Sequence, residues 1–205
     1  MKPLVGEVGM AVPAIKAIIF DCFGVLYVDS KKSLLDIVPL ARQAELHDIF
    51  TANNYGYYDK NEYLAQVAAV TGMTPQQVAD YAAHEHRANQ RLLEVIRSQL
   101  RGRYKLGLLS NIGREWIYDF FSKHQLHELF DEVVLSGEEG ITKPSVAIFE
   151  LMAERLGLEP AECLMIDDIV ENCTGAQAAG MRTIHFQDTT QLLGELYNMI
   201  DIKSD

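Results

Sequence analysis

Five short segments rich in β-branched and aliphatic residues recur along the chain, and each precedes a polar turn and a stretch whose apolar residues have helical spacing. The segments are residues 15–20, 104–110, 132–136, 163–167 and 182–186. Helices that alternate with strands return the chain to the same end of a sheet, so that neighbouring strands run parallel. The sequence therefore predicts an α/β protein built on a parallel sheet.

The helices between these strands are expected at residues 114–124, 146–156, 170–179 and 190–197. More than 80 residues separate the first two strands, which exceeds an ordinary loop. This stretch has the pattern of helices at 34–50, 60–71, 75–84 and 86–100, and its last part, about 91–101, would return as the first crossover helix. We expect a loose leader at 1–13, a helical cap at 29–90, and a core formed by 14–28 and 91–205.

Composition narrows the classes of function. Of the 205 residues, 48% are hydrophobic, enough for one α/β domain with a sizeable core and a small insertion. The formal net charge of -11, without a Lys/Arg run, predicts neither a nucleic-acid nor a membrane partner. Three scattered cysteines do not suggest a disulfide framework or a zinc site, and no apolar run is long enough to span a membrane. Residues 1–13 lack the pattern of a secretory signal, so we expect a cytoplasmic protein.

Polar side chains follow four of the expected strands, where the carboxyl ends of parallel strands open onto a crevice. They are Asp21, Ser110 with Asn111, Lys143 before Pro144, and Asp167 with Asp168. Any one of them alone is more often a turn former or a helix cap. Four complementary groups in succession indicate an active site, with Asp21 placed as an aspartyl nucleophile.

Four segments resemble the motifs of the haloacid dehalogenase superfamily, whose members are aspartyl-nucleophile hydrolases with a Rossmann-like sheet and a mobile cap. The segments are residues 21–25, 108–111, 142–144 and 166–172, and the resemblance extends from residue 14 to about 187. An insertion directly after the first motif is typical of subfamily IA, and the fourth motif is similar to that of the phosphatase domain of soluble epoxide hydrolases and of bacterial sugar-phosphate phosphatases. The resemblance implies an α/β fold with helices on both faces of a Rossmann-like parallel sheet, and a small helical cap inserted after the first strand.

Three carboxylates, those of Asp21, Asp167 and Asp168, are expected close together, which is costly unless a cation lies among them. An oxygen-lined site suits Mg²⁺, whereas the alternative is that one carboxylate pairs with Lys143 and no metal binds. The resemblance implies that Asp21 binds the metal through one oxygen and attacks with the other, and that the Phe23 carbonyl and Asp168 complete the protein ligands. It leaves Asp167 either as a ligand or as a group one step removed from the metal.

The same resemblance assigns the phosphoryl group of a substrate to the second and third motifs. Ser110 and the neighbouring backbone amides would hold the transferring oxygens, and Lys143 would neutralise charge on the nucleophile and in the transition state. Asn111 would either contribute to phosphate binding or cap the next helix.

Phe23 stands where phosphoryl-transferring relatives usually have a second Asp, which acts as general acid and base. Loss of that catalysis typically lowers the rate ~10² to 10⁴-fold. Dehalogenases of the superfamily have Tyr or Phe at this position, whereas the pair Asp167-Asp168 is phosphatase-like. Three functions follow: Mg²⁺-dependent hydrolysis of a phosphorylated metabolite, dehalogenation of a 2-haloacid or another carbon-centred hydrolysis, and metabolite binding with little turnover.

The cap is expected to select a small, phosphorylated substrate for a protein that is a monomer or a homodimer. One candidate for its inner face is the cluster of Tyr55, Tyr57, Tyr58 and Lys60. Such a cluster near a helix start is also common in ordinary packing, and that alternative stays open.

Overall fold

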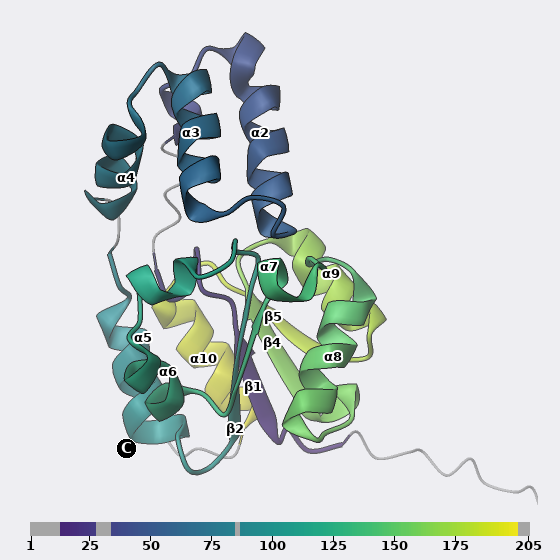
Figure 1. Cartoon of the computed structure of the whole chain (residues 1–205). Coiled ribbons are helices and arrows are strands. Elements are labelled where there is room, and N and C mark those ends of the chain that lie inside the picture. Colours follow the sequence, from purple (N-terminus) through teal and green to yellow (C-terminus); the bar gives the residue numbers. More distant parts are fainter. Residues whose placement is uncertain (1–12, 28–33, 85–86, 201–205) are drawn as a thin grey trace, which may run out of the picture.

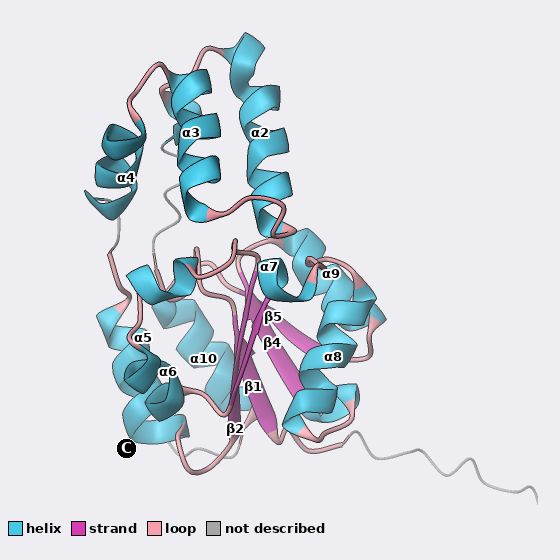
Figure 2. Ribbon diagram, in the orientation of Figure 1, coloured by secondary structure: helices cyan, strands magenta, loops and turns pink. Residues whose placement is uncertain are grey.

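The computed structural model describes residues 13–27, 34–84 and 87–200. Its centre is a five-stranded parallel sheet with the strand order β3-β2-β1-β4-β5 (Figures 1 and 2). The strands are β1 (Ala17–Phe20), β2 (Lys105–Ser110), β3 (Glu132–Leu135), β4 (Cys163–Asp167) and β5 (Arg182–His185). The prediction of an α/β fold with a Rossmann-like parallel sheet is confirmed. Because the strand order reverses at β1, the carboxyl end of that strand opens onto the crevice where such sheets bind ligands.

Alternate side chains of β1, β2 and β4 enter two different hydrophobic cores. On β1, Ile18 and Phe20 belong to one core and Ala17 and Ile19 to the other, and all four are fully buried. The first core is covered by α5 (Gln90–Val95), the π-helical turn Ile96–Leu100, α6 (Lys123–Leu129) and α10 (Thr189–Met199). The second is covered by α8 (Val146–Leu156) and α9 (Val170–Ala178). Helices therefore cover both faces of the sheet, as the sequence predicts (Figure 2).

The insertion after β1 stands above the carboxyl ends of the strands (Figure 1). It contains α2 (Leu40–Asn54), α3 (Lys60–Thr71) and α4 (Pro75–His84). At its base, Lys60 Nζ lies 2.6 Å from an Asp119 carboxylate oxygen and 4.7 Å from the ring centroid of Trp116. Ser136, at the start of the short helix α7 (Ser136–Glu139), donates through Oγ to the Asn54 carbonyl at 2.6 Å. These contacts hold the cap over the carboxyl ends of the strands. The exact division at residues 28–29 and 90–91 stays a prediction, and residues 1–12 of the expected leader lie outside the described part.

Three expected helix boundaries are wrong. The helix expected at 114–124 is instead a 3₁₀ turn, η2 (Trp116–Asp119), followed by α6, because Ser122 and Gln125 form a capping box that starts the new helix. The cap helix expected at 34–50 begins at Leu40, directly after Pro39, and continues to Asn54. The helix expected at 86–100 begins at Gln90, where the Asn89 side chain caps the Leu92 N–H, and residue 86 itself is not described.

The described helices include none that is both long and apolar enough to cross a lipid bilayer.

Candidate active site

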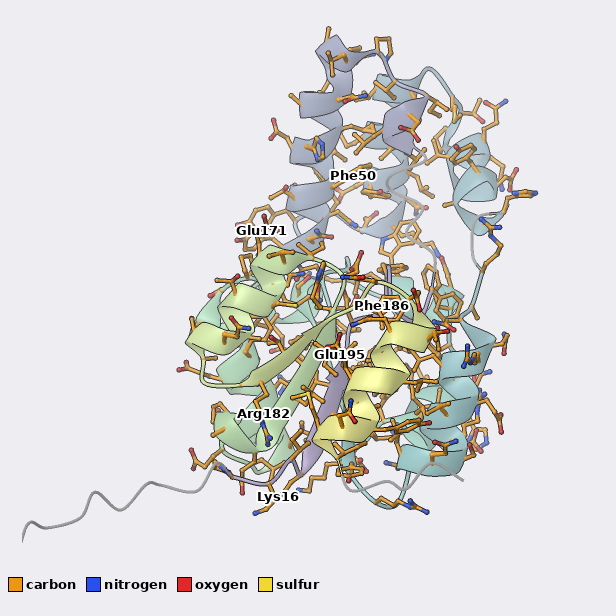
Figure 3. All side chains as sticks on the ribbon, turned by 180° about the vertical axis from the view of Figure 1, so that it is seen from behind. Lys16, Phe50, Glu171, Arg182, Phe186 and Glu195 are labelled. Carbon is orange, nitrogen blue, oxygen red and sulfur yellow. The ribbon has the colours of Figure 1, made fainter. Side chains whose placement is uncertain are left out.

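A pocket of about 350 Å³ lies between the cap and the carboxyl ends of the strands. The core contributes the side of the pocket that carries the charged groups, and the cap contributes the facing wall. From the core it is lined by Asp21, Phe23, Asn111, Lys143, Asp168, Ile169 and Asn172, and from the cap by Leu35, His47, Phe50, Thr51 and Asn54. Figure 3 shows Phe50 on the cap, above the core, and Lys16 at the opposite end of the sheet.

Asp21 is fixed at the end of β1 by the sheet itself. Its N–H donates to the Ile166 carbonyl of the adjacent β4 at 2.9 Å, and its Oδ1 accepts the N–H of Cys22 at 2.6 Å. The residue is 5% exposed and lines the pocket. The sheet edge thus presents a nearly buried carboxylate to the pocket, as expected of a nucleophile.

Lys143 lies between two carboxylates. Its Nζ is 2.9 Å from Asp21 Oδ1 and 2.6 Å from Asp167 Oδ2, and the lysine side chain is fully buried. The Asn111 side chain holds the Lys143 backbone, because its Nδ2 donates to the Lys143 carbonyl and its Oδ1 accepts the Lys143 N–H, both at 2.9 Å. Asn111 therefore positions the lysine, and the alternative of a helix cap is not what these bonds show.

Asp167 is engaged through both carboxylate oxygens. While Oδ2 accepts from Lys143, Oδ1 accepts the Ile169 N–H and the Asn172 Nδ2, each at 2.9 Å. The side chain is fully buried. Of the two roles left open by the sequence, these hydrogen bonds favour a group that holds Lys143 over one that binds a metal directly.

The electrostatics of the cluster follow from burial and from its excess of negative charge. Burial raises the pKa of Asp21 from 3.8 to about 8, with further increases from Asp167 and Asp168 that the Lys143 ammonium opposes. Burial alone would lower the pKa of Lys143, but Asp21 and Asp167 outweigh it, and the pKa of the lysine is raised. The negatively charged form of Asp21 is therefore electrostatically unfavourable when Lys143 is the only cation beside the three carboxylates.

The donor set fits Mg²⁺. Carboxylate oxygens of Asp21, Asp167 and Asp168 lie within 4.8 Å of one another. Three carboxylates and the Lys143 ammonium leave two negative charges, which a divalent cation balances. A Cβ at Gly24, whose φ is +85°, would lie 2.2 Å from Asp168 Oδ2, so the backbone there leaves room for the carboxylate. Hard oxygen donors of this kind suit Mg²⁺, and Asp21 and Asp168 are the side chains that would hold it.

Ser110 and Phe23 differ in how they meet the pocket. Ser110 is fully buried at the end of β2 and is not among the described residues that line the pocket. Its Oγ has no hydrogen-bond partner within the described part of the chain. Phe23 does line the pocket, and its ring packs edge-on against Phe120 at 4.8 Å between centroids. The position at which the resemblance places a general acid is therefore occupied by an apolar ring contact.

The residues that line the cap side were not found from the sequence. Tyr55 and Tyr57 stack on each other at 5.8 Å, and Lys60 pairs with Asp119. None of the four residues of that cluster lines the pocket as described, so packing is the better interpretation. The signal in the sequence was the spacing of His47, Phe50, Thr51 and Asn54, which places all four on one face of α2.

Comparison with known proteins agrees with this geometry. The family model of haloacid dehalogenase-like hydrolases matches residues 15–180. The sesquiterpene phosphatase astK of Aspergillus oryzae is 26% identical over 194 residues, which are 90% of this chain and 96% of that protein. The glyceraldehyde 3-phosphate phosphatase of Methanothermobacter thermautotrophicus is 37% identical over 84 residues, which are 40% of this chain and 36% of that protein.

Solved structures share the fold. A HAD family enzyme of Bacteroides thetaiotaomicron, in complex with magnesium and inorganic phosphate, superposes with a TM-score of 0.71 at 24% identity, over 87% of this chain and 99% of that chain. An L-2-haloacid dehalogenase of Xanthobacter autotrophicus superposes with a TM-score of 0.61 at 22% identity, over 90% of this chain and 83% of that chain. At these identities the likeness concerns the fold alone.

The raised pKa of Asp21 predicts a pH-dependent stability of the metal-free protein. The folded state holds the Asp21 proton up to about pH 8, whereas the ordinary carboxyl loses it near 3.8. The free energy of unfolding should therefore fall as the pH rises between about 4 and about 8. Asp21→Asn removes this dependence, so its advantage over the parent should grow with pH in urea unfolding with chelator present. Asp48→Asn, at an exposed position, is the control, and equal pH profiles for the parent and Asp21→Asn would contradict the prediction.

Proposed function

This chain belongs to the haloacid dehalogenase-like hydrolase family, and we propose that it hydrolyses a small phosphorylated metabolite with Mg²⁺ as cofactor. The observation that carries the proposal is the cluster of Asp21, Asp168 and the Asp167-bound Lys143 at the floor of the pocket. Phosphatases among the relatives support it, including one that aligns along nearly its whole length and is named for a sesquiterpene phosphate. The proposed substrate is accordingly a monophosphate of a small organic molecule.

In this mechanism the chain's own residues bind, attack and neutralise. The Asp21 oxygen that does not face Lys143 attacks phosphorus, and the phosphoryl group is transferred to the carboxylate before water releases it. Lys143 lowers the cost of negative charge on Asp21 and on the transferring group, and Asn111 and Asp167 keep its ammonium in place. Ser110 Oγ donates to a phosphoryl oxygen. Mg²⁺, held by Asp21, Asp168 and the Phe23 carbonyl, would supply electrostatic neutralisation of the phosphoryl oxygens.

Phe23 favours a second candidate, dehalogenation at carbon, because a halide needs no proton to leave. Two observations weigh against it. The acidic pair Asp167-Asp168 lies within 4.8 Å of Asp21 and gives a donor set suited to a cation, and several of the relatives that match the sequence are phosphatases. A protein that binds a phosphorylated metabolite without turnover remains the third candidate, distinguished from the others by turnover itself.

The proposal predicts phosphate release that requires Mg²⁺. Acyl phosphates, phosphomonoesters and 2-haloacids are supplied in turn, each with Mg²⁺ and with chelator, and phosphate or halide is measured. We expect phosphate to be released only when Mg²⁺ is present. The rate of release should fall at least ~10³-fold in Asp21→Asn because the nucleophile is removed. Halide release that is indifferent to chelator would support the dehalogenase, and Mg²⁺-induced thermal stabilisation without any turnover would support the binding protein.

A second prediction concerns the missing acid. Phe23→Asp places a carboxyl group beside the nucleophile, so turnover of alkyl phosphates, whose leaving groups need a proton, should rise at least tenfold and by up to the ~10² to 10⁴ typical of such catalysis. The carboxylate released from an acyl phosphate leaves without protonation, so the turnover of acyl phosphates should gain little. Phe23→Asn is the matched control, because asparagine has the size of aspartate but no acidic proton. An equal gain in both variants would contradict the explanation.

A further inference from the structure

Apolar side chains form much of the pocket's lining beside its charged groups. Leu35 and Phe50 contribute from the cap, and Phe23 and Ile169 from the core. Ile169 is 47% exposed, which leaves a large apolar side chain in contact with water at the pocket. Such a surface is covered favourably by an apolar ligand.

The cap's polar contributions carry no acidic or strongly basic group. They are His47, Thr51 and Asn54, and no Asp, Glu, Lys or Arg of the described cap residues lines the pocket. All of the described lining carboxylates and the ammonium belong to the floor, in Asp21, Lys143 and Asp168. The charged lining groups of the described residues therefore all lie on the core side, which suits a phosphoryl group, and the uncharged remainder of the lining includes four apolar side chains that suit a hydrocarbon.

We propose that the organic part of the substrate is apolar, so that this protein acts on phosphates of hydrocarbon-rich molecules in preference to sugar or amino-acid phosphates. This inference rests on the proposed function for the orientation of the phosphoryl group. A densely hydroxylated substrate would leave hydroxyls facing Phe23, Leu35, Phe50 and Ile169 without hydrogen-bond partners, which penalises its binding.

Acyl phosphates of rising chain length test this inference at constant leaving-group chemistry. Acetyl, butyryl and octanoyl phosphate release carboxylates of similar basicity, so differences in kcat/KM report contacts with the chain. We expect kcat/KM to rise up to about fourfold for each methylene that becomes buried, and at least tenfold from acetyl to octanoyl phosphate. A flat series, with phosphate released from all three, would overturn the inference and leave the proposed function standing.

Neighbouring residues provide matched variants. Ile169 lines the pocket, whereas Val170, 55% exposed, does not. Ile169→Asn and Leu35→Asn should each reduce the octanoyl-to-acetyl ratio at least threefold, while Val170→Asn should keep it. Equal effects of Ile169→Asn and Val170→Asn would count against the assignment of the wall.

Binding of phosphonates separates this inference from the proposed reaction. Octylphosphonate, kept below its micelle concentration, should bind the Mg²⁺-loaded protein at least tenfold more tightly than methylphosphonate in titration calorimetry. That preference in a protein that releases no phosphate would support the inference and refute the proposed function. Equal affinities would overturn the inference whatever the turnover.

A second inference arises from a separate observation, the absence of an acid at Phe23. Of the described residues that line the pocket, four have side chains that exchange protons, and Asp21, Lys143 and Asp168 belong to the charged floor. The fourth is His47, on the face of α2 that also carries Phe50 and Thr51. Imidazole can donate a proton and take it back near neutral pH.

We infer that His47 transfers the proton that Phe23 cannot, at a lower rate than a carboxyl group at position 23 would. The imidazolium gives its proton to the leaving oxygen as the phosphorus–oxygen bond breaks, which yields the neutral alcohol and the phosphorylated Asp21. The neutral imidazole then accepts a proton from the water that attacks phosphorus, and the cycle returns Asp21, free phosphate and the imidazolium. No other reactant is required for this balance.

Leaving-group dependence in a double-mutant cycle tests His47. His47→Gln should lower kcat for an alkyl phosphate at least tenfold and leave acyl phosphate turnover within threefold, because only the former needs the proton. In the Phe23→Asp background the same substitution should lose most of its effect, since the new carboxyl replaces the imidazole. Asp48→Asn, exposed on the same helix, is the control.

Three outcomes would overturn the role of His47. They are an equal loss on both classes of substrate, a loss that persists in the Phe23→Asp background, and a parent protein that does not turn over alkyl phosphates.

Discussion

The position of the Lys143 ammonium between two carboxylates is the constraint on which the rest of the site depends. Asp21 at the end of β1 and Asp167 at the end of β4 both lie within 2.9 Å of its Nζ. Removing three charges from water is strongly unfavourable unless they are paired and hydrogen-bonded. The hydrogen bonds supplied by Cys22, Ile169 and Asn172 to the carboxylates, and by Asn111 to the lysine backbone, meet that requirement. One ion-paired group thus fixes the relative positions of all four motifs.

Its surplus charge explains why the same cluster is suited to chemistry. The lysine neutralises only one of the three carboxylates, and the pKa of Asp21 rises to about 8 because burial and its acidic neighbours prevail. A cation placed among the oxygens would relieve the repulsion and keep the nucleophile ionised at neutral pH. Without a bound cation, the repulsion among the three carboxylates therefore makes the cluster electrostatically unfavourable. That property distinguishes it from the paired charges on the surface, such as those of Arg42 and Glu45, which solvent screens.

The sequence was sufficient for the sheet and for the charged floor of the site, and insufficient for the cap. Strands end where apolar runs end, so the residues after Phe20, Leu109 and Ile166 must lie together at the carboxyl end of the sheet. Their chemical character can therefore be predicted from the sequence. The hydrogen-bond partner of each polar group could not be predicted. Asn111 pairs with Lys143, 32 residues away along the chain, and Asn172 with Asp167, 5 residues away, and each pairing depends on the side-chain rotamers. The boundary of α6 was missed for a local reason, since the capping box at Ser122 competed with a continuous apolar pattern.

The cap could not be oriented from its sequence because each of its helices must face two neighbours. On α2, Leu46 and Ile49 are buried in the hydrophobic core, His47 and Thr51 line the pocket, and Phe50 belongs to both sets, each of which satisfies helical spacing. Only the docking contacts decide between them, through Asn54 against Ser136 and Lys60 against Asp119. Phe23 lines the pocket with a ring that packs on Phe120, so the side chain at this position is apolar. The core therefore holds the charged cluster and its ion pairs, and the face of α2 that the docked cap presents supplies the opposite wall of the pocket.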